Sequence, residues 1–289
     1  MEAGSVSLVS VVIPCRNAAT DLRGQLSALA RQGYQEPWEV IVSDNGSTDA
    51  TAEVALSFRD VLPIRVVNSR DRPGHAHARN AGADAAAGDK ILFLDADDEA
   101  APGYIRAMTN ALESSDAAAA RLDWDKLNPP WVRNSRLPGQ QQELLDVLGF
   151  LPFGLSCGLG VRRTAYEAVN GFHDVPYAED VDFCWRLQLA GKTLQFVPDA
   201  VLHQRFRGTL RGLFDQSRRY GTGQVVLYQK FAPAGMPRRS MQATAVDYAR
   251  TLWWLRKVRD KADWGRWVHR FGYRVGRVEG SVRRRTLYL

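Results

Sequence analysis

The acids that follow one apolar run indicate metal and phosphate chemistry. Residues 90–98 read KILFLDADD, so a continuous apolar stretch, typical of a strand buried on both faces, runs directly into Asp95, Asp97 and Asp98. In an open α/β sheet, ligands bind beyond the carboxyl ends of the strands. Carboxylate oxygens there suit Mn²⁺ or Mg²⁺, which proteins usually hold together with substrate phosphates. The pattern therefore predicts a metal-bound phosphate at this strand end, although acids that only cap the next helix would look the same.

The elements that must position these acids alternate between strand and helix patterns. Strand patterns occupy residues 7–14, 38–43, 64–68 and 90–94, with later ones at 117–122 and 158–161. Helix patterns lie between them, at 20–32, in the stretch that ends at Phe58, and around 77–82. This alternation predicts an α/β fold with a Rossmann-like, mostly parallel sheet flanked by helices.

The composition is that of a globular protein. The chain has 289 residues, of which 45% are hydrophobic and 24% charged, which argues against disorder. Cys15, Cys157 and Cys184 lie far apart without metal-binding spacing, so we expect no disulfide framework and a reducing, cytoplasmic location. The N-terminus lacks a signal-peptide pattern, and the longest apolar stretch, residues 144–161, contains Asp146. We therefore expect no membrane span.

Charge is distributed unevenly along the chain. Residues 1–200 carry 18 Lys and Arg against 27 Asp and Glu, whereas residues 201–289 carry 20 against 5. Arg outnumbers Lys 32 to 6, which is typical of a GC-rich bacterial source. We expect the acidic and basic parts to have different roles, and no nucleic acid partner, because no recognition motif accompanies the basic part.

The basic part contains an amphipathic helix pattern between Trp264 and Val282. The apolar side comprises Trp264, Trp267, Val268, Phe271, Val275, Val278 and Val282, and the opposite side Arg266, Arg270, Arg274 and Arg277. Three glycines at four-residue spacing interrupt it, at 272, 276 and 280, and each costs about 1 kcal/mol of helix propensity, so the helix needs a partner surface. The partner could be the catalytic part, with the aromatic residues buried and the arginines in water, or a second subunit, or the inner, anionic face of a membrane.

Six motifs in order resemble those of the family 2 glycosyltransferases, which are inverting nucleotide-sugar enzymes of the A-type glycosyltransferase fold. The motifs are VVIPCRN (11–17), VSDNGSTD (42–49), GHAHARNAG (74–82), AGDKILFLDADD (87–98), NGF (170–172) and AEDVDFCWRL (178–187). The resemblance covers residues 5–207. It implies a catalytic domain at 1–207 that binds a nucleoside diphosphate sugar, with UDP-sugars favoured, and transfers the sugar to an acceptor hydroxyl. Residues 208–289 would form a helical, basic extension outside the common core.

The resemblance also implies roles for individual residues. Contacts to the donor would come from Pro14, Arg16, Asp44, Arg79, Asp95, Arg205 and Arg207. The metal, Mn²⁺ or Mg²⁺, would be held by Asp95, Asp97 and His203. The base that takes the acceptor proton would be Asp180, with Glu179 as the second candidate.

Several of these residues also have ordinary structural explanations. Asp44 could be a turn residue, Arg79 a solvated helix residue and His203 a structural histidine after a strand. Asn45 departs from the family pattern, because many members have a second aspartate at its position. The loop at 124–133, rich in aromatic and charged residues, could contact the acceptor or be an ordinary surface loop.

Two other functions are compatible with an acidic α/β site. A sugar-phosphate nucleotidylyltransferase would carry a glycine-rich basic signature after the first strand, where this chain has PCRN at 14–17. A non-catalytic nucleotide-sugar-binding subunit need not keep Asp95, Asp97 and Asp180, all of which are present. Neither a dinucleotide fingerprint nor a Gly-Lys-Ser phosphate loop follows the first strand, which argues against dehydrogenases and kinases.

Overall fold

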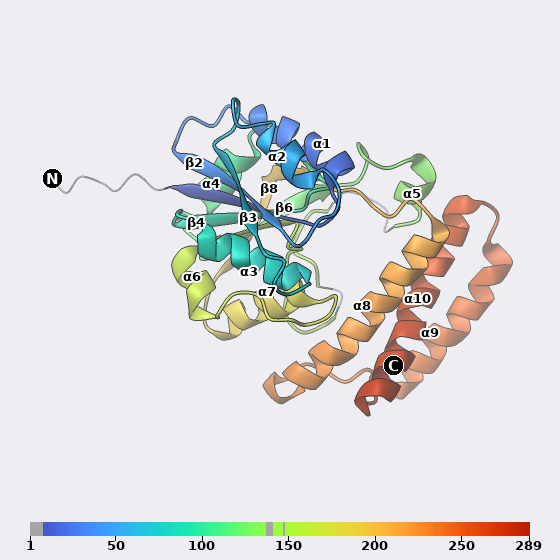
Figure 1. Ribbon diagram of the computed structural model, residues 1–289. Helices are drawn as coiled ribbons and strands as arrows, with labels where there is room; N and C mark the ends of the chain where they lie inside the picture. Colours follow the sequence, from blue (N-terminus) through green and yellow to red (C-terminus); the bar gives the residue numbers. More distant parts are fainter. Residues whose placement is uncertain (1–7, 137–140, 147) are drawn as a thin grey trace.

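The computed structural model describes residues 8–136, 141–146 and 148–289, and shows an α/β part followed by three long helices (Figure 1). The strands are β1 (Val9–Cys15), β2 (Trp38–Asp44), β3 (Ile64–Asn68), β4 (Lys90–Leu94), β5 (Glu99–Ala100), β6 (Ala117–Asp123), β7 (Gly158–Arg162) and β8 (Leu194–His203). The helices of the α/β part are α1 (Ala19–Ala30), α2 (Thr51–Leu56), α3 (His75–Ala85), α4 (Tyr104–Ala111), α5 (Pro130–Asn134), α6 (Arg163–Ala168) and α7 (Glu179–Leu189). The long helices are α8 (Leu210–Phe231), α9 (Met241–Trp254) and α10 (Lys261–Arg284), with 3₁₀ turns at Ala232–Ala234 and Leu255–Lys257.

The strands form one mixed sheet in the order β3-β2-β1-β4-β7-β6-β8-β5. The first four run parallel, β7 is antiparallel to both β4 and β6, and β8 is parallel to β6. All strands except β7 and the short β5 therefore point in the same direction. The predicted mostly parallel α/β sheet is confirmed, and the carboxyl ends of β1, β2, β4, β6 and β8 share one edge.

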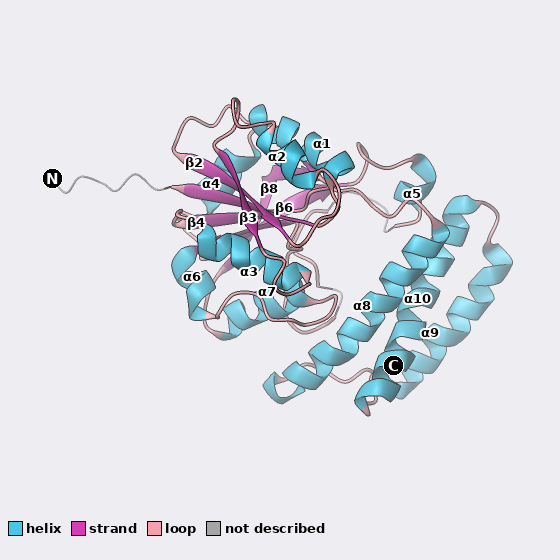
Figure 2. Ribbon diagram, viewed as in Figure 1, coloured by secondary structure: helices cyan, strands magenta, loops and turns pink. Residues whose placement is uncertain are grey.

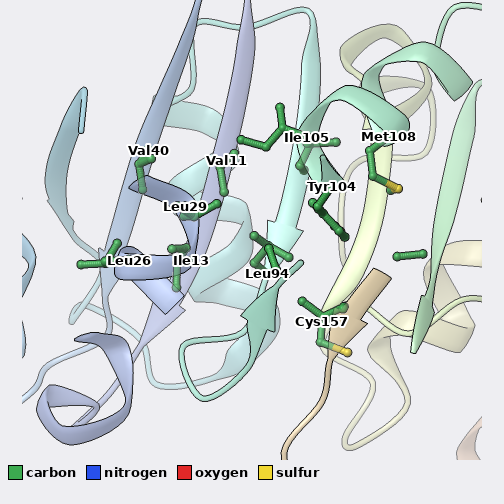
Figure 3. Packing of buried hydrophobic residues seen from close by; sticks show 14 of the residues in the cluster. Val11, Ile13, Leu26, Leu29, Val40, Leu94, Tyr104, Ile105, Met108 and Cys157 are labelled. Carbon is green, nitrogen blue, oxygen red and sulfur yellow. The ribbon is translucent and has the colours of Figure 1, made fainter. Parts of the chain in front are cut away.

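Helices cover both faces of the sheet, and each face has its own core (Figure 2). Strand β4 shows why its sequence has no polar alternation. Leu92 and Leu94 belong to the hydrophobic cluster under α1 and α4, which Figure 3 shows. Phe93 points to the other face, where the centre of its ring lies 5.0 Å from the centre of the Phe172 ring. Both sides of β4 are buried, as its continuous apolar run predicted.

The long helices α8 and α10 pack against each other through glycines. A Cβ added to Gly276 would lie 1.9 Å from the carbonyl oxygen of Arg218, and one added to Gly221 would lie 2.2 Å from that of Tyr273. Only residues without a Cβ permit such a close approach of two helix backbones. The partner surface that the glycine-interrupted helix required is therefore α8, and α8 in turn inserts Val225 and Phe231 into the core beside α7.

The orientation of α10 differs from the predicted packing in which the aromatic residues are buried and the arginines face water. Its glycine side is buried, and the buried residues include Arg274 and Arg277, so the prediction that these arginines face water is wrong. Trp264 is exposed rather than buried against the catalytic part, and the indole Nε1 of Trp267 donates to the carbonyl oxygen of Thr251 in α9. The backbone contact with α8 decides the orientation, because a glycine face can approach a backbone more closely than a face of large side chains can.

The first helix of the predicted extension, α8, begins at Leu210, where the N-cap Thr209 accepts a hydrogen bond from the Gly212 N–H. A domain boundary between residues 207 and 208 stays a prediction. Across the described residues, we find no helix that combines the length and the hydrophobicity needed to cross a bilayer.

Candidate active site

Asp44 is the last residue of β2, and Asn45 follows it, at the shared sheet edge. The Asp44 carboxylate accepts a hydrogen bond from the Ser47 N–H at 2.9 Å and remains partly accessible. The Asn45 amide is buried, donates to the carbonyl oxygens of Ser69 and Arg72, and accepts from the Gly74 N–H at 2.9 Å. An aspartate could not donate the first two bonds, which explains the departure at position 45: the amide ties the loops after β2 and β3 together.

Pro14 and Arg16 lie at the end of β1, next to this turn. Pro14 is the register partner of Ser43 in β2, and Arg16 is exposed. The following residue, Asn17, has a positive φ of 53°, and its side-chain oxygen accepts from the Thr48 N–H at 2.8 Å. The loops after β1 and β2 are thus joined, which places Arg16 beside the turn that carries Asp44.

Arg79, on α3, connects two acidic groups that are distant in sequence. Its Nη2 donates to Asp95 Oδ1 at 2.8 Å and its Nη1 to Glu179 Oε1 at 2.9 Å, and its side chain is only 3% exposed. Burial opposes its charge, but the two carboxylates raise the pKa of Arg79 above its usual value. The structure therefore does not show a solvated helix arginine. It shows an arginine that positions Asp95 and Glu179, while the predicted contact with a diphosphate remains a prediction.

The three acids after β4 form a dense negative cluster. Burial, with the nearby Asp95 charge, raises the pKa of Asp97 to about 6. Burial, with the charges of Asp95 and Asp97, also raises the pKa of Asp98 well above its usual value. The carboxylate of Asp98 accepts from the Arg205 N–H at 2.8 Å and from the thiol of Cys157. Arg79 pairs with Asp95, but among the described residues Asp97 and Asp98 form no ion pair, and a bound cation would stabilise such crowded carboxylates.

The ligand atoms that lie closest together differ from the predicted set. Among the described residues, Asp95, Asp98 and Cys157 each offer a ligand atom within 4.8 Å of the others. Asp97 and His203 are not in this group, and their role as metal ligands stays a prediction. The structure thus adds Asp98, already visible as the third acid of the motif, and Cys157, for which the sequence carried no signal.

His203, at the end of β8, faces Asp123 at the end of β6. The two residues are register partners, and His203 Nδ1 is hydrogen-bonded to Asp123 Oδ2. Asp123 was not among the predicted residues, although its place after a strand is the signal that had singled out Asp44 and Asp95.

The loop that follows His203 is fixed to the acids and to the 124–133 loop. Arg205 Nε donates to the Asp97 carbonyl oxygen at 3.0 Å, and the positive charge of Arg207 acts to lower the pKa of Asp97, against the larger effect of burial. The side chain of Asn128 donates to the Gln204 carbonyl oxygen at 2.7 Å and accepts from the Phe206 N–H at 2.8 Å. Arg205 and Arg207, two of the four arginines predicted to contact the donor, therefore lie beside the acidic cluster, next to the loop where acceptor contacts were expected.

Asp180 lies in the first turn of α7, next to Glu179. Burial, reinforced by the charge of Glu179, raises the pKa of Asp180 to about 7, although backbone N–H groups of Val181 and Ser156 bond to the carboxylate and act in the opposite direction. A carboxyl group with this pKa can take up and release a proton near neutral pH. The preceding loop is held by α8, because a Cβ added to Gly223 would lie 2.8 Å from the carbonyl oxygen of Pro176.

The arrangement therefore combines two chemical capacities. The acids at 95–98 can hold a cation and, through it, a phosphate group, and the carboxyl group of Asp180 can accept a proton. Arg79 joins the two groups by direct hydrogen bonds to Asp95 and to Glu179. The sequence placed the acids correctly at the ends of their elements, but this connection spans 100 positions and had no local signal.

Comparison with known proteins identifies similar sequences over most of the chain. A family model described as glycosyl transferase family 2 matches residues 10–169, and one described as glycosyl transferase family group 2 matches residues 149–265. Validoxylamine A glucosyltransferase of Streptomyces hygroscopicus subsp. jinggangensis is 44% identical over 108 residues, covering 37% of this chain and 26% of that protein. Poly-beta-1,6-N-acetyl-D-glucosamine synthase of Staphylococcus epidermidis is 25% identical over 248 residues, covering 80% and 58%. The chain thus spans about a quarter to somewhat over half of the length of these relatives.

Solved structures show the same fold. Mannosyltransferase PcManGT from Pyrobaculum calidifontis, in complex with GDP-Man and Mn²⁺, matches with a TM-score of 0.62 and 18% identity, over 95% of this chain and 88% of that one. S. aureus TarS 1-349 in complex with UDP-GlcNAc matches with a TM-score of 0.57 and 17% identity, over 97% and 93%. At these identities the likeness concerns the fold, which is the one that the sequence predicted.

Proposed function

Because this chain belongs to glycosyl transferase family 2 and is a glycosyltransferase, we propose that it transfers a sugar from a nucleoside diphosphate sugar to an acceptor hydroxyl, with inversion at the anomeric carbon. The observation that carries the proposal is the link through Arg79. One guanidinium group touches Asp95, in the acidic cluster, and Glu179, beside the carboxyl group with a pKa of about 7. The acidic cluster on the donor side and the proton acceptor are thereby held at fixed positions relative to each other, as a transfer reaction requires.

The acidic cluster fits a divalent cation on the donor side. Asp95, Asp97 and Asp98 supply the hard oxygen ligands that Mn²⁺ and Mg²⁺ prefer, and His203 would complete the set if it turned away from Asp123. The bound ion would neutralise the charge that develops on the leaving diphosphate. Mn²⁺ in the PcManGT complex supports this proposal. Arg205 and Arg207 lie beside the cluster, where their positive charge would attract the diphosphate.

Asp180 acts as the base on the acceptor side. Its carboxylate accepts the hydroxyl proton as the acceptor oxygen forms a bond to the anomeric carbon and the bond from that carbon to the diphosphate oxygen breaks. The electron pair of the broken bond leaves with the nucleoside diphosphate. A pKa of about 7 makes Asp180 a stronger base than an ordinary aspartate and still leaves it substantially ionised at neutral pH.

We favour a uridine nucleotide as the donor base. Asp44 is accessible at the end of β2 and has one oxygen engaged by the Ser47 N–H, so that its other oxygen can accept a hydrogen bond from the N–H of a uracil ring. Structural neighbours bind UDP-GlcNAc in one case and GDP-Man in another, so the test must include both nucleotides.

The deciding experiment measures release of nucleoside diphosphate from UDP-glucose, UDP-GlcNAc and GDP-mannose, with Mn²⁺ or with EDTA. We expect metal-dependent release from one uridine donor, lost in Asp180→Asn and kept in Asp174→Asn, an exposed aspartate on the preceding loop. A nucleotidylyltransferase would instead produce pyrophosphate from a nucleoside triphosphate and a sugar phosphate. A non-catalytic subunit would bind a donor without releasing diphosphate from it, and either result would contradict the proposal.

A further inference from the structure

Most of the α9 surface has no partner. Of its 14 residues, only Thr244 and Thr251 are buried. Leu252 and Trp253 are 62% and 48% exposed, and Val246 is also exposed. Helical geometry places Val246 and Trp253, seven residues apart, on the side opposite the two buried threonines. Within the described part of the chain, the outward side of α9 is therefore both apolar and uncovered.

A second apolar surface, a groove of about 440 Å³, lies between α9 and α10, and the exposed Leu252 also lines it. Its lining comprises Tyr248, Leu252, Phe271, Val275 and Val278, with Thr251, Arg274 and Glu279 as the polar members. Val282, one turn beyond Val278 on α10, is 73% exposed and continues the surface. The one acid in the lining, Glu279, is paired with Arg218 at 2.9 Å and with Arg283 at 2.6 Å, so it does not make the groove negative.

Basic side chains surround the apolar surface. Residues 236–289 carry 14 Lys and Arg against 4 Asp and Glu. The Lys257 ammonium lies 4.3 Å from the centre of the Trp253 ring, and the Arg270 guanidinium lies 3.8 Å from that of Trp254. Tryptophans next to cationic side chains suit the boundary between lipid tails and headgroups, where one end of the side chain is apolar and the other is wet.

Positive charge also lies beneath the groove. Arg239 and Arg274 share the single carboxylate of Asp247. Arg277 is only 8% exposed, its Nη1 has no hydrogen-bond partner, and no carboxylate lies within 4 Å of it among the described residues. Burial, with the charge of Arg239, lowers the pKa of Arg277 to about 10. An anionic group at the groove, which Arg274 lines, would balance this excess of positive charge.

From this geometry we infer that the α9–α10 hairpin docks onto a lipid bilayer with anionic headgroups. Leu252, Trp253 and Val282 enter the boundary between headgroups and tails, while the surrounding arginines and lysines stay at the headgroups. A second copy of the chain is a poorer occupant, because a two-fold contact would press this strongly basic surface against itself. The acidic excess of residues 1–200 would be repelled by such a bilayer, so docking proceeds through the hairpin alone.

The test is sedimentation of the full chain with vesicles of phosphatidylglycerol and phosphatidylcholine, or of phosphatidylcholine alone, at low and high salt. No sugar donor is present, so the result does not depend on the proposed transfer reaction. We expect binding to the anionic vesicles at low salt only. Each basic residue near an anionic surface strengthens binding by about fivefold, so R256E/K257E should weaken it by at least about 25-fold. L252Q/W253Q should also weaken it, because it removes the inserting side chains.

The matched controls are V61Q, at a side chain 65% exposed on the α/β part, and R211E, at the exposed start of α8. Both should bind as the wild type does. Unchanged circular dichroism would show that the hairpin variants fold. Absence of binding to anionic vesicles at low salt would overturn the inference, as would equal losses in the controls. So would a concentration-dependent dimer that L252Q/W253Q disperses, since the surface would then bind a second copy.

Discussion

Replacing Asp180 by asparagine tests whether this carboxyl group is the base of the proposed reaction. The amide keeps the size and polarity of the carboxyl group but can neither take a proton nor carry a charge. Transfer should fall by at least about a hundredfold, because the acceptor hydroxyl loses its base. Donor affinity should stay nearly unchanged, because the acids at 95–98 are untouched.

The same change should stabilise the fold in a pH-dependent way. Burial and the charge of Glu179 raise the pKa of Asp180 from 3.8 to about 7 in the folded chain. A carboxyl group whose pKa is raised by folding contributes its full stability below the unfolded pKa and loses it as the pH rises through the folded pKa. Between a pH of about 4 and about 7, the wild type therefore loses as much as about 4 kcal/mol of unfolding free energy through this group. The asparagine variant has no such group and keeps that stability.

Two measurements check this reasoning. Urea unfolding from pH 4 to pH 8 should show a variant that gains on the wild type as the pH rises and then stays level, whereas Asp174→Asn, with an exposed side chain, should follow the wild type. The kcat/KM of the wild type should rise with pH and level off above about 7, since the base must be ionised.

A pH-independent stability difference would refute the desolvation of Asp180. Retained transfer in Asp180→Asn, with loss in Glu179→Gln, would assign the base to the neighbouring residue. A pH–rate profile without an inflection near neutral pH would show that the ionisation of Asp180 does not control the rate, which would contradict its role as the base.

Three further predictions concern the rest of the site and the helical extension. Asp97→Ala should abolish Mn²⁺-dependent donor binding in calorimetry while leaving the fold intact, and equal wild-type affinity with and without Mn²⁺ would contradict the metal site. Arg79→Met leaves Asp95 and Glu179 without their shared cation and should cost about 3–5 kcal/mol in urea unfolding, which an unchanged midpoint would exclude. Gly276→Val forces α8 and α10 apart and should cost about 3 kcal/mol or more, whereas Gly208→Ala, with open space around it, should be neutral; equal effects would refute the close contact.

The sequence by itself determined the sheet and the positions of the acids along the chain. An apolar run such as that of β4 can be buried on both faces whatever surrounds it, so local pattern was enough to predict a strand. The rule that ligands bind at the carboxyl ends of such strands then pointed to Asp44 and to Asp95 without knowledge of the tertiary structure. The difference in net charge between residues 1–200 and residues 201–289 likewise followed from residue counts alone.

Tertiary structure alone decided how these residues interact. The bonds from Arg79 to Asp95 and to Glu179 join positions 16 and 100 residues apart, and no local pattern encodes a contact of that kind. The packing of α10 was decided in the same way. By sequence alone, each glycine lowers helix propensity and each large apolar residue is expected to be buried. Once the α8 backbone approaches within contact distance, only glycine fits between the helices, so the small residues are buried and the large apolar ones are left outside.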